Sequence, residues 1–144
     1  MSIESILKHK GRKVVCIAPS TTVGVAAGRL RVDRIGALIV SSEGQHIEGI
    51  LSERDIVQGL TEHGADVIAM PVSALMSRHV VTCGPGAGVS EVMRLMTQHR
   101  VRHVPVVDNG QLVGIVSIGD VVKSRVEAME LEANVLHDYF VAHQ

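Results

Sequence analysis

Apolar residues follow a fixed order of short runs and helical spacings in the first half of the chain. The run Val14–Ile17 predicts a strand, and the stretch after it has apolar residues at i, i+3, i+4 and i+7, the spacing of a helix with one buried face. Those residues are Val23, Ala26, Ala27 and Leu30. The runs 37–40 and 47–51 predict two strands joined by a turn. A second helix is expected to begin at Ser52, because a serine hydroxyl can accept a free N–H of the first turn.

The same order of patterns returns in the second half. The run 80–83 is strand-like, and the helical spacing after it is carried by Val89, Val92, Met93 and Met96. The runs 104–107 and 112–116 predict two strands, and the Asn-Gly pair between them is a strong hairpin signal. A last helix is expected to begin at Ser117.

Individual residues recur as well. Five residues return 66 positions later: Val14, Val15, Pro19, Val23 and Arg34 as Val80, Val81, Pro85, Val89 and Arg100. Five more return 65 positions later: Gly49, Ile50, Ser52, Asp55 and Val57 as Gly114, Ile115, Ser117, Asp120 and Val122. An internal repeat sets the architecture. We therefore expect an α/β protein of two strand–helix–strand–strand–helix units packed as a pseudo-twofold pair.

The repeat divides the chain into five segments. They are an N-terminal helix or basic segment 1–13, a first domain 14–66, a linker 67–79, a second domain 80–124 and a C-terminal helix extension 125–144. The linker contains a predicted helical turn at Pro71–Met76. Because the linker is short and fairly apolar, the two halves should pack together.

Composition excludes several classes of function. The chain has 144 residues, a net charge of −1 and only 1% aromatic residues. Few aromatics argue against stacking on single-stranded nucleic acid, and near-neutral charge argues against general phosphate-backbone binding. No apolar run approaches the ~20 residues of a membrane span, and the N-terminus lacks a signal peptide. We expect a cytoplasmic protein that binds neither nucleic acid nor membrane, in which Cys16 and Cys83 are small apolar residues.

Two matching motifs precede the last helix of each copy. Gly49–Asp55 reads GILSERD and Gly114–Asp120 reads GIVSIGD, both Gly-hydrophobic-hydrophobic-Ser-x-x-Asp, and His103–Val107 reads HVPVV. Within the repeated five-element unit, these motifs resemble the CBS domain, and two in tandem resemble a CBS pair, or Bateman module. The resemblance covers about Val14 to Val122, so we expect a stand-alone pair with no attached enzyme.

The resemblance implies adenosine-containing ligands (AMP, ADP, ATP, NAD or S-adenosylmethionine) in clefts between the two domains. It implies that Asp55 and Asp120 bind ribose hydroxyls and that Ser52 and Ser117 contact phosphate or ribose. Around adenine, the resemblance implies Cys16, Ile17, Thr82 and Cys83. At the phosphates it implies Arg54, Arg102 and His103. It also implies Gly36, Ala37 and Pro105, in or next to the strand runs 37–40 and 104–107. A carboxylate can accept both hydrogen bonds of a cis-diol, and helix N-termini favour anions. Plain helix capping is the alternative role of the two Ser–Asp pairs, and the two roles can coexist.

The copies differ where cations are expected. Copy one has Gly36-Ala37 where copy two has Arg102-His103, and copy two has Gly119 where copy one has Arg54. The two clefts should therefore differ in affinity. The basic run 8–13 is either a solvated face or a segment that bends over a cleft, where Lys10 would pair with ligand phosphate.

Other chemistry is less well supported. The glycines of Gly84–Gly88 are spaced GxGxG rather than GxGxxG and occur in one copy only, so a Rossmann-type dehydrogenase is not expected. Among the eight histidines, His99 and His103 could share a neighbourhood with His79, but no HxxxH pair lies on a clear helix face with a nearby acid. No nucleophile–base pair is evident. We expect no enzyme and no required metal.

The C-terminal helix carries a heptad-like seam. Its apolar residues are spaced 4, 3, 4, 3, 4: Val122, Val126, Met129, Ala133, Leu136 and Phe140. Two interpretations stay open: the helix folds back onto its own domain, or the seam receives a partner, most simply a second copy. The chain as a whole is thus expected to be a regulatory module that senses AMP, ATP or NAD(H). The alternative is a structural dimerisation module with degenerate clefts, acting by protein–protein contact.

Overall fold

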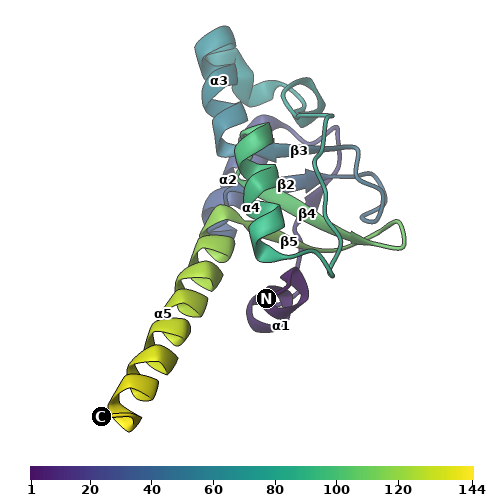
Figure 1. Cartoon of the computed structure of the whole chain (residues 1–144). Helices are drawn as coiled ribbons and strands as arrows, with labels where there is room; N and C mark the ends of the chain where they lie inside the picture. Colours follow the sequence, from purple (N-terminus) through teal and green to yellow (C-terminus); the bar gives the residue numbers. More distant parts are fainter.

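The computed structural model describes all residues from Met1 to Gln144 and confirms an α/β pair of repeated units (Figure 1). The first unit contains a three-stranded sheet in the order β1-β2-β3, in which β1 is parallel to β2 and β2 is antiparallel to β3. Its elements are β1 (Cys16–Ile17), α2 (Val23–Asp33), β2 (Ala37–Val40), β3 (Gly49–Ser52) and α3 (Glu53–His63). Strand β1 is shorter than expected, although the Val15 carbonyl still accepts a hydrogen bond from the Ile39 N–H.

The second unit repeats this arrangement with one strand fewer. Its elements are α4 (Val89–His99), β4 (His103–Asp108), β5 (Gln111–Ser117) and α5 (Ile118–Ala142). The strand expected at 80–83 does not form, and only an isolated parallel bridge joins Cys83 to Val106. In the first unit the Ile39 N–H donates to the Val15 carbonyl, but the equivalent residue of β4 is Pro105, which has no N–H to donate to Val81.

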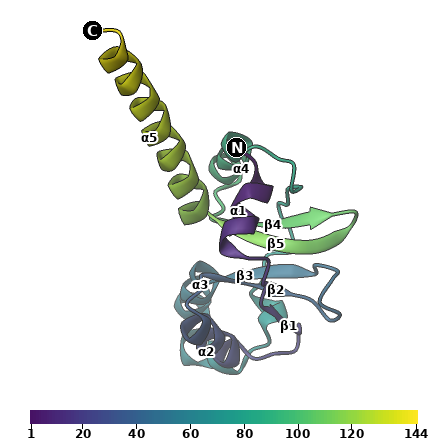
Figure 2. The same cartoon turned by 90° about the horizontal axis from the view of Figure 1, so that it is seen from below.

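The helix α1 (Ile3–Lys10) packs against the second unit, although the chain continues from it into the first (Figure 2). Ile3, Ile6 and Leu7 are buried in the core that α4, β4 and β5 form. The Ile3 N–H also donates to the Ala87 carbonyl at 2.9 Å. The expected separate N-terminal segment is thus placed in the core of the second unit.

The linker does the reverse and packs against the first unit. It forms two 3-10 helices, η1 (Gly64–Ala69) and η2 (Val72–Ala74), the second of which is the helical turn predicted from the sequence. Val67 and Val72 are buried in the first core. Because the segment before each unit packs on the other unit, the two halves are interlocked.

The C-terminal helix α5 projects away from the body (Figures 1 and 2). Within it only Val121 and Ser124 are buried. The interpretation that this helix folds back onto its own domain is therefore wrong. None of the helices combines the length and apolar composition that crossing a bilayer requires.

Candidate functional site

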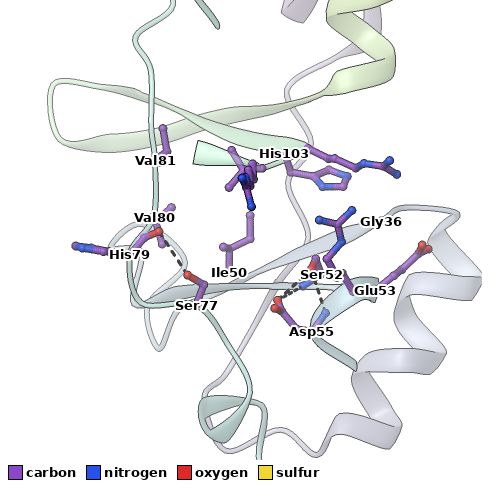
Figure 3. Close-up of a pocket in the computed structure, with 14 residues that line it drawn as sticks. Gly36, Ile50, Ser52, Glu53, Asp55, Ser77, His79, Val80, Val81 and His103 are labelled. Carbon is purple, nitrogen blue, oxygen red and sulfur yellow. Dashed lines mark hydrogen bonds between the residues drawn. The ribbon is translucent and has the colours of Figure 1, made fainter. Parts of the chain in front are cut away.

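A cleft of about 340 Å³ lies where the start of α3 faces the second unit (Figure 3). This volume is within the roughly 300–1,000 Å³ range of small-molecule sites. From the first unit come Gly36, Ile50, Ser52, Glu53, Arg54 and Asp55; from the linker and second unit come Ser77, His79, Val80, Val81, Arg100, Val101, Arg102 and His103. We call it the first cleft.

A second cleft of about 400 Å³ is built from the equivalent residues with the two units exchanged. Ser117 and Asp120 replace Ser52 and Asp55. The edge of the first unit supplies Val14, Val15, Arg34, Ile35, Gly36 and Ala37, and the remaining lining residues are Lys10, Lys13, His103 and Ile115. Each cleft therefore combines the Ser-x-x-Asp helix start of one unit with the strand edge of the other, as the pseudo-twofold repeat requires.

Both Ser–Asp pairs close a capping box, as the sequence predicted. The Asp55 N–H donates to Ser52 Oγ at 3.3 Å, and the Ser52 N–H donates to Asp55 Oδ2 at 2.8 Å. The corresponding distances for Ser117 and Asp120 are 3.2 and 2.8 Å. Capping uses one carboxylate oxygen of each aspartate, so the other can still accept a hydrogen bond from a ligand.

The two aspartates have different neighbours. Asp55 Oδ2 accepts a further hydrogen bond from Ser52 Oγ at 3.0 Å, and Asp55 makes no ion pair. Asp120 Oδ2 instead pairs with Lys10 Nζ at 2.7 Å, and Lys10 also donates to the Ile115 carbonyl at 2.9 Å. Burial alone would raise the pKa of Asp120, but hydrogen bonds from Lys10 and Ser117 outweigh it and hold the pKa below its ordinary value. In the second cleft, the Asp120 carboxylate is therefore already paired with Lys10.

His103 lies between the clefts and lines both of them. Burial lowers its pKa below the ordinary value, although Glu53 opposes the shift, so the imidazole is mainly neutral at pH 7. A Cβ at Gly36 would lie 2.9 Å from both Cε1 and Nε2 of His103. Gly36 is thus needed for the ring to take this position.

Most of the residues predicted from the sequence are brought together. The first cleft contains Gly36, Ser52, Arg54, Asp55, Arg102 and His103, and the second contains Lys10, Gly36, Ala37, His103, Ser117 and Asp120. Five predicted residues line neither cleft: Cys16, Ile17, Thr82, Cys83 and Pro105. Cys16 and Ile17 follow Val14-Val15 in the chain, and Thr82 and Cys83 follow Val80-Val81, which take the lining positions. Pro105 lies within β4.

Both cysteine thiols have a raised pKa, which leaves less of the nucleophilic thiolate at neutral pH. Burial, reinforced by nearby Glu91, raises the pKa of Cys83 to about 11, and burial also raises the pKa of Cys16. Both are free. No group of three or more His, Cys, Asp or Glu side chains is placed to hold a metal ion.

Sequence reasoning missed three basic residues of the clefts, Arg34, His79 and Arg100, and included a fourth, Lys13, only as part of the basic run 8–13. A signal for two of them was available, because Arg34 and Arg100 are repeat equivalents. Both end a helix with positive φ, 53° and 54°, which is uncommon for a residue other than glycine. The recurrence marks a shared position that places an arginine at each cleft.

Comparison with known proteins decides the family. The CBS domain model matches residues 5–62 and 72–127. The chain belongs to the CBS domain family. It is 36% identical over 108 residues to the CBS domain-containing protein YhcV of Bacillus subtilis, covering 75% of this chain and 76% of that protein.

Solved CBS structures share the fold. The CBS-domain containing protein ATU1752 from Agrobacterium tumefaciens is 42% identical with a TM-score of 0.84, covering 87% of this chain and 99% of that one. The CBS domain pair of protein MJ0100, at 24% identity and a TM-score of 0.76, covers 90% of this chain and 98% of that one. MJ0100 was crystallised in complex with 5′-methylthioadenosine and S-adenosyl-L-methionine.

Proposed function

We propose that this CBS pair is a regulatory module that binds an adenosine-containing ligand, of the AMP, ATP or NAD(H) type, in one or both clefts. The observation that carries the proposal is the duplicated cleft, in which a carboxylate at a helix N-terminus faces a basic strand edge of the other unit. Neither a metal nor a catalytic group is needed for this role. We further propose that the module works in the cytoplasm and passes its occupancy to a partner protein.

The lining supplies one group for each part of such a ligand. Asp55 or Asp120 would accept the ribose hydroxyls. In the first cleft, Arg54, Arg100 and Arg102 supply positive charge for phosphate. At the α3 N-terminus the Glu53 and Asp55 N–H groups are already bonded, which leaves the Arg54 N–H for an anion. The adenosine ligands of MJ0100 support this class of ligand.

The base has an apolar surface in each cleft. Val80, Val81 and Ile50 line the first, and Val14, Val15 and Ile115 line the second. We place adenine against these side chains, slightly before the Cys16–Ile17 and Thr82–Cys83 positions that the family resemblance implied. The contact is apolar burial rather than aromatic stacking, because the clefts contain no Phe, Tyr or Trp.

A thermal-shift screen with AMP, ATP, NADH and S-adenosylmethionine tests the proposal. A ligand present at 100 times its dissociation constant adds about 2.7 kcal/mol of stability, which raises the melting temperature by roughly 5–10 °C. The variant Asp55→Asn/Asp120→Asn should lose this response, because each amide keeps the cap through its carbonyl oxygen but loses the charge that favours a diol. If no adenosine compound at millimolar concentration stabilises the wild type, the proposal fails.

A second candidate function is favoured by the exposed apolar residues of α5. In that case the chain is an interaction module that acts by protein–protein contact while its clefts stay empty. The same screen separates the two candidates, since only the first predicts that adenosine compounds stabilise the chain.

A further inference from the structure

The projecting helix α5 carries an unpartnered apolar seam. Val122, Val126, Met129, Leu136 and Phe140 are between 43 and 65% exposed, and Ala133 is exposed with them. Contiguous apolar surface of this kind in a folded chain marks an interaction site. Leu131, Val135, Tyr139 and Val141 are exposed on α5 as well but lie outside this seam.

The seam faces away from the body. An α-helix turns by roughly 100° per residue, which places the seam about a third of a turn from Val121 and Ser124, the two residues buried against the body. A second helix can therefore lie along the seam without displacing the contacts between α5 and the rest of the chain.

Charges flank the seam in a heptad register. If Val126, Ala133 and Phe140 take position a, then Val122, Met129 and Leu136 take position d. Position e is then occupied by Lys123, Glu130 and His137, and position g by Arg125, Glu132 and Tyr139. Residues at e and g set the orientation and partner of a coiled coil.

We propose that α5 pairs in parallel with α5 of a second copy of this chain. In a parallel pair each g residue meets the e residue five positions later on the other helix. Arg125 then faces Glu130 of the second copy, and Glu132 faces His137, each pair occurring twice. All six seam residues are covered, each against its own counterpart.

Antiparallel pairing cannot both cover the whole seam and pair opposite charges. Full overlap of the seam would centre the pair near Leu131 and bring Glu130 opposite Glu130 and Glu132 opposite Glu132, which are repulsive contacts. Sliding the helices until Lys123 faces Glu130 and Arg125 faces Glu132 moves Leu136 and Phe140 beyond the partner's seam. Only the parallel arrangement buries the whole seam and pairs opposite charges.

Charge reversal in the full-length protein tests the parallel pair. Sedimentation equilibrium without ligand should show a dimer for the wild type, and Arg125→Glu and Glu130→Arg should each weaken it by roughly tenfold. A one-to-one mixture of the two variants should recover the dimer, because both g–e contacts of the heterodimer are attractive. Asp138→Lys, at position f and outside the flanks, is the matched control and should dimerise as the wild type does.

Each other outcome overturns the proposal. A monomeric wild type, or a dimer that neither charge reversal affects, means that α5 does not pair through this seam. A mixture that fails to recover excludes the parallel orientation, because an antiparallel heterodimer would keep half of its contacts repulsive. Since no ligand is present, the result is independent of whether the clefts bind adenosine.

Discussion

At the scale of single residues, Asp55 and Asp120 have the same backbone role but different side-chain partners. Both close a capping box, yet only Asp120 pairs with a lysine, at 2.7 Å. Lys10 bonds Asp120 Oδ2, the oxygen that also accepts the capping bond, so Oδ1 stays open to a ribose, but the ammonium already neutralises part of the charge that a ribose would use. A ligand that carries phosphate can compensate, because the Lys10 ammonium can also bind the phosphate.

Lys10→Met should therefore change the selectivity of the second cleft between charged and neutral ligands. We expect adenosine to bind more tightly, since Lys10 no longer neutralises the carboxylate that its ribose uses, while AMP gains less because it loses a phosphate partner. The ratio of AMP to adenosine affinity should fall by about tenfold. Isothermal titration in an Asp55→Ala background, which disables the first cleft, measures this ratio.

Lys8→Met is the control for this substitution. Lys8 is exposed on the same helix and lines neither cleft. The ratio of AMP to adenosine affinity in Lys8→Met should equal that of the Asp55→Ala background protein. An unchanged ratio in Lys10→Met would mean that Lys10 does not contact the ligand and that its pairing with Asp120 is purely structural.

At the scale of elements, apolar spacing and capping residues predicted the local structure. The stripe from Val23 to Leu30 became α2, and Ser52 and Ser117 start α3 and α5. Two features were not predictable. The strand at 80–83 is absent because pairing depends on partners elsewhere in the chain, and the position of α1 depends on which unit its apolar face meets. An amphipathic pattern shows that a face is buried but not against what.

Leu7→Ala tests whether α1 belongs to the second core. Leu7 is 1% exposed within that core, so we expect unfolding in urea to show a loss of about 2–5 kcal/mol. Lys8→Ala, one residue along and exposed, should change stability by less than about 0.5 kcal/mol. A loss as small as this for Leu7→Ala would contradict the packing.

The close contact between α1 and β5 allows a double-mutant test of the same packing. A Cβ at Gly114 would lie 2.7 Å from Leu7 Cδ2, so Gly114→Ala alone should destabilise the chain. In the Leu7→Ala background that Cβ has room, and the two losses should sum to less than their separate values. Strict additivity would mean that Leu7 and Gly114 do not touch.

At the scale of the whole molecule, the repeat predicted which residues belong to one kind of site but not how the units share them. Ser52 and Asp55 were predicted as site residues, and they line a cleft together with Arg102 and His103. The valines at 80–81 were missed because cleft lining depends on how the strand edge of one unit meets the other. One unit alone does not contain that information.

The pseudo-twofold repeat also makes each aspartate the matched control of the other. Asp55→Ala and Asp120→Ala each remove one capping box, so both should cost a similar amount of stability, about 0.5–2 kcal/mol. Their effects on ligand binding should differ. Asp55→Ala removes a carboxylate with no ion pair, whereas Asp120→Ala also frees Lys10, which can then turn to the phosphate and offset part of the loss. Titration with AMP should therefore show a larger loss of affinity at the first cleft than at the second, and equal losses would contradict the inferred difference between the clefts.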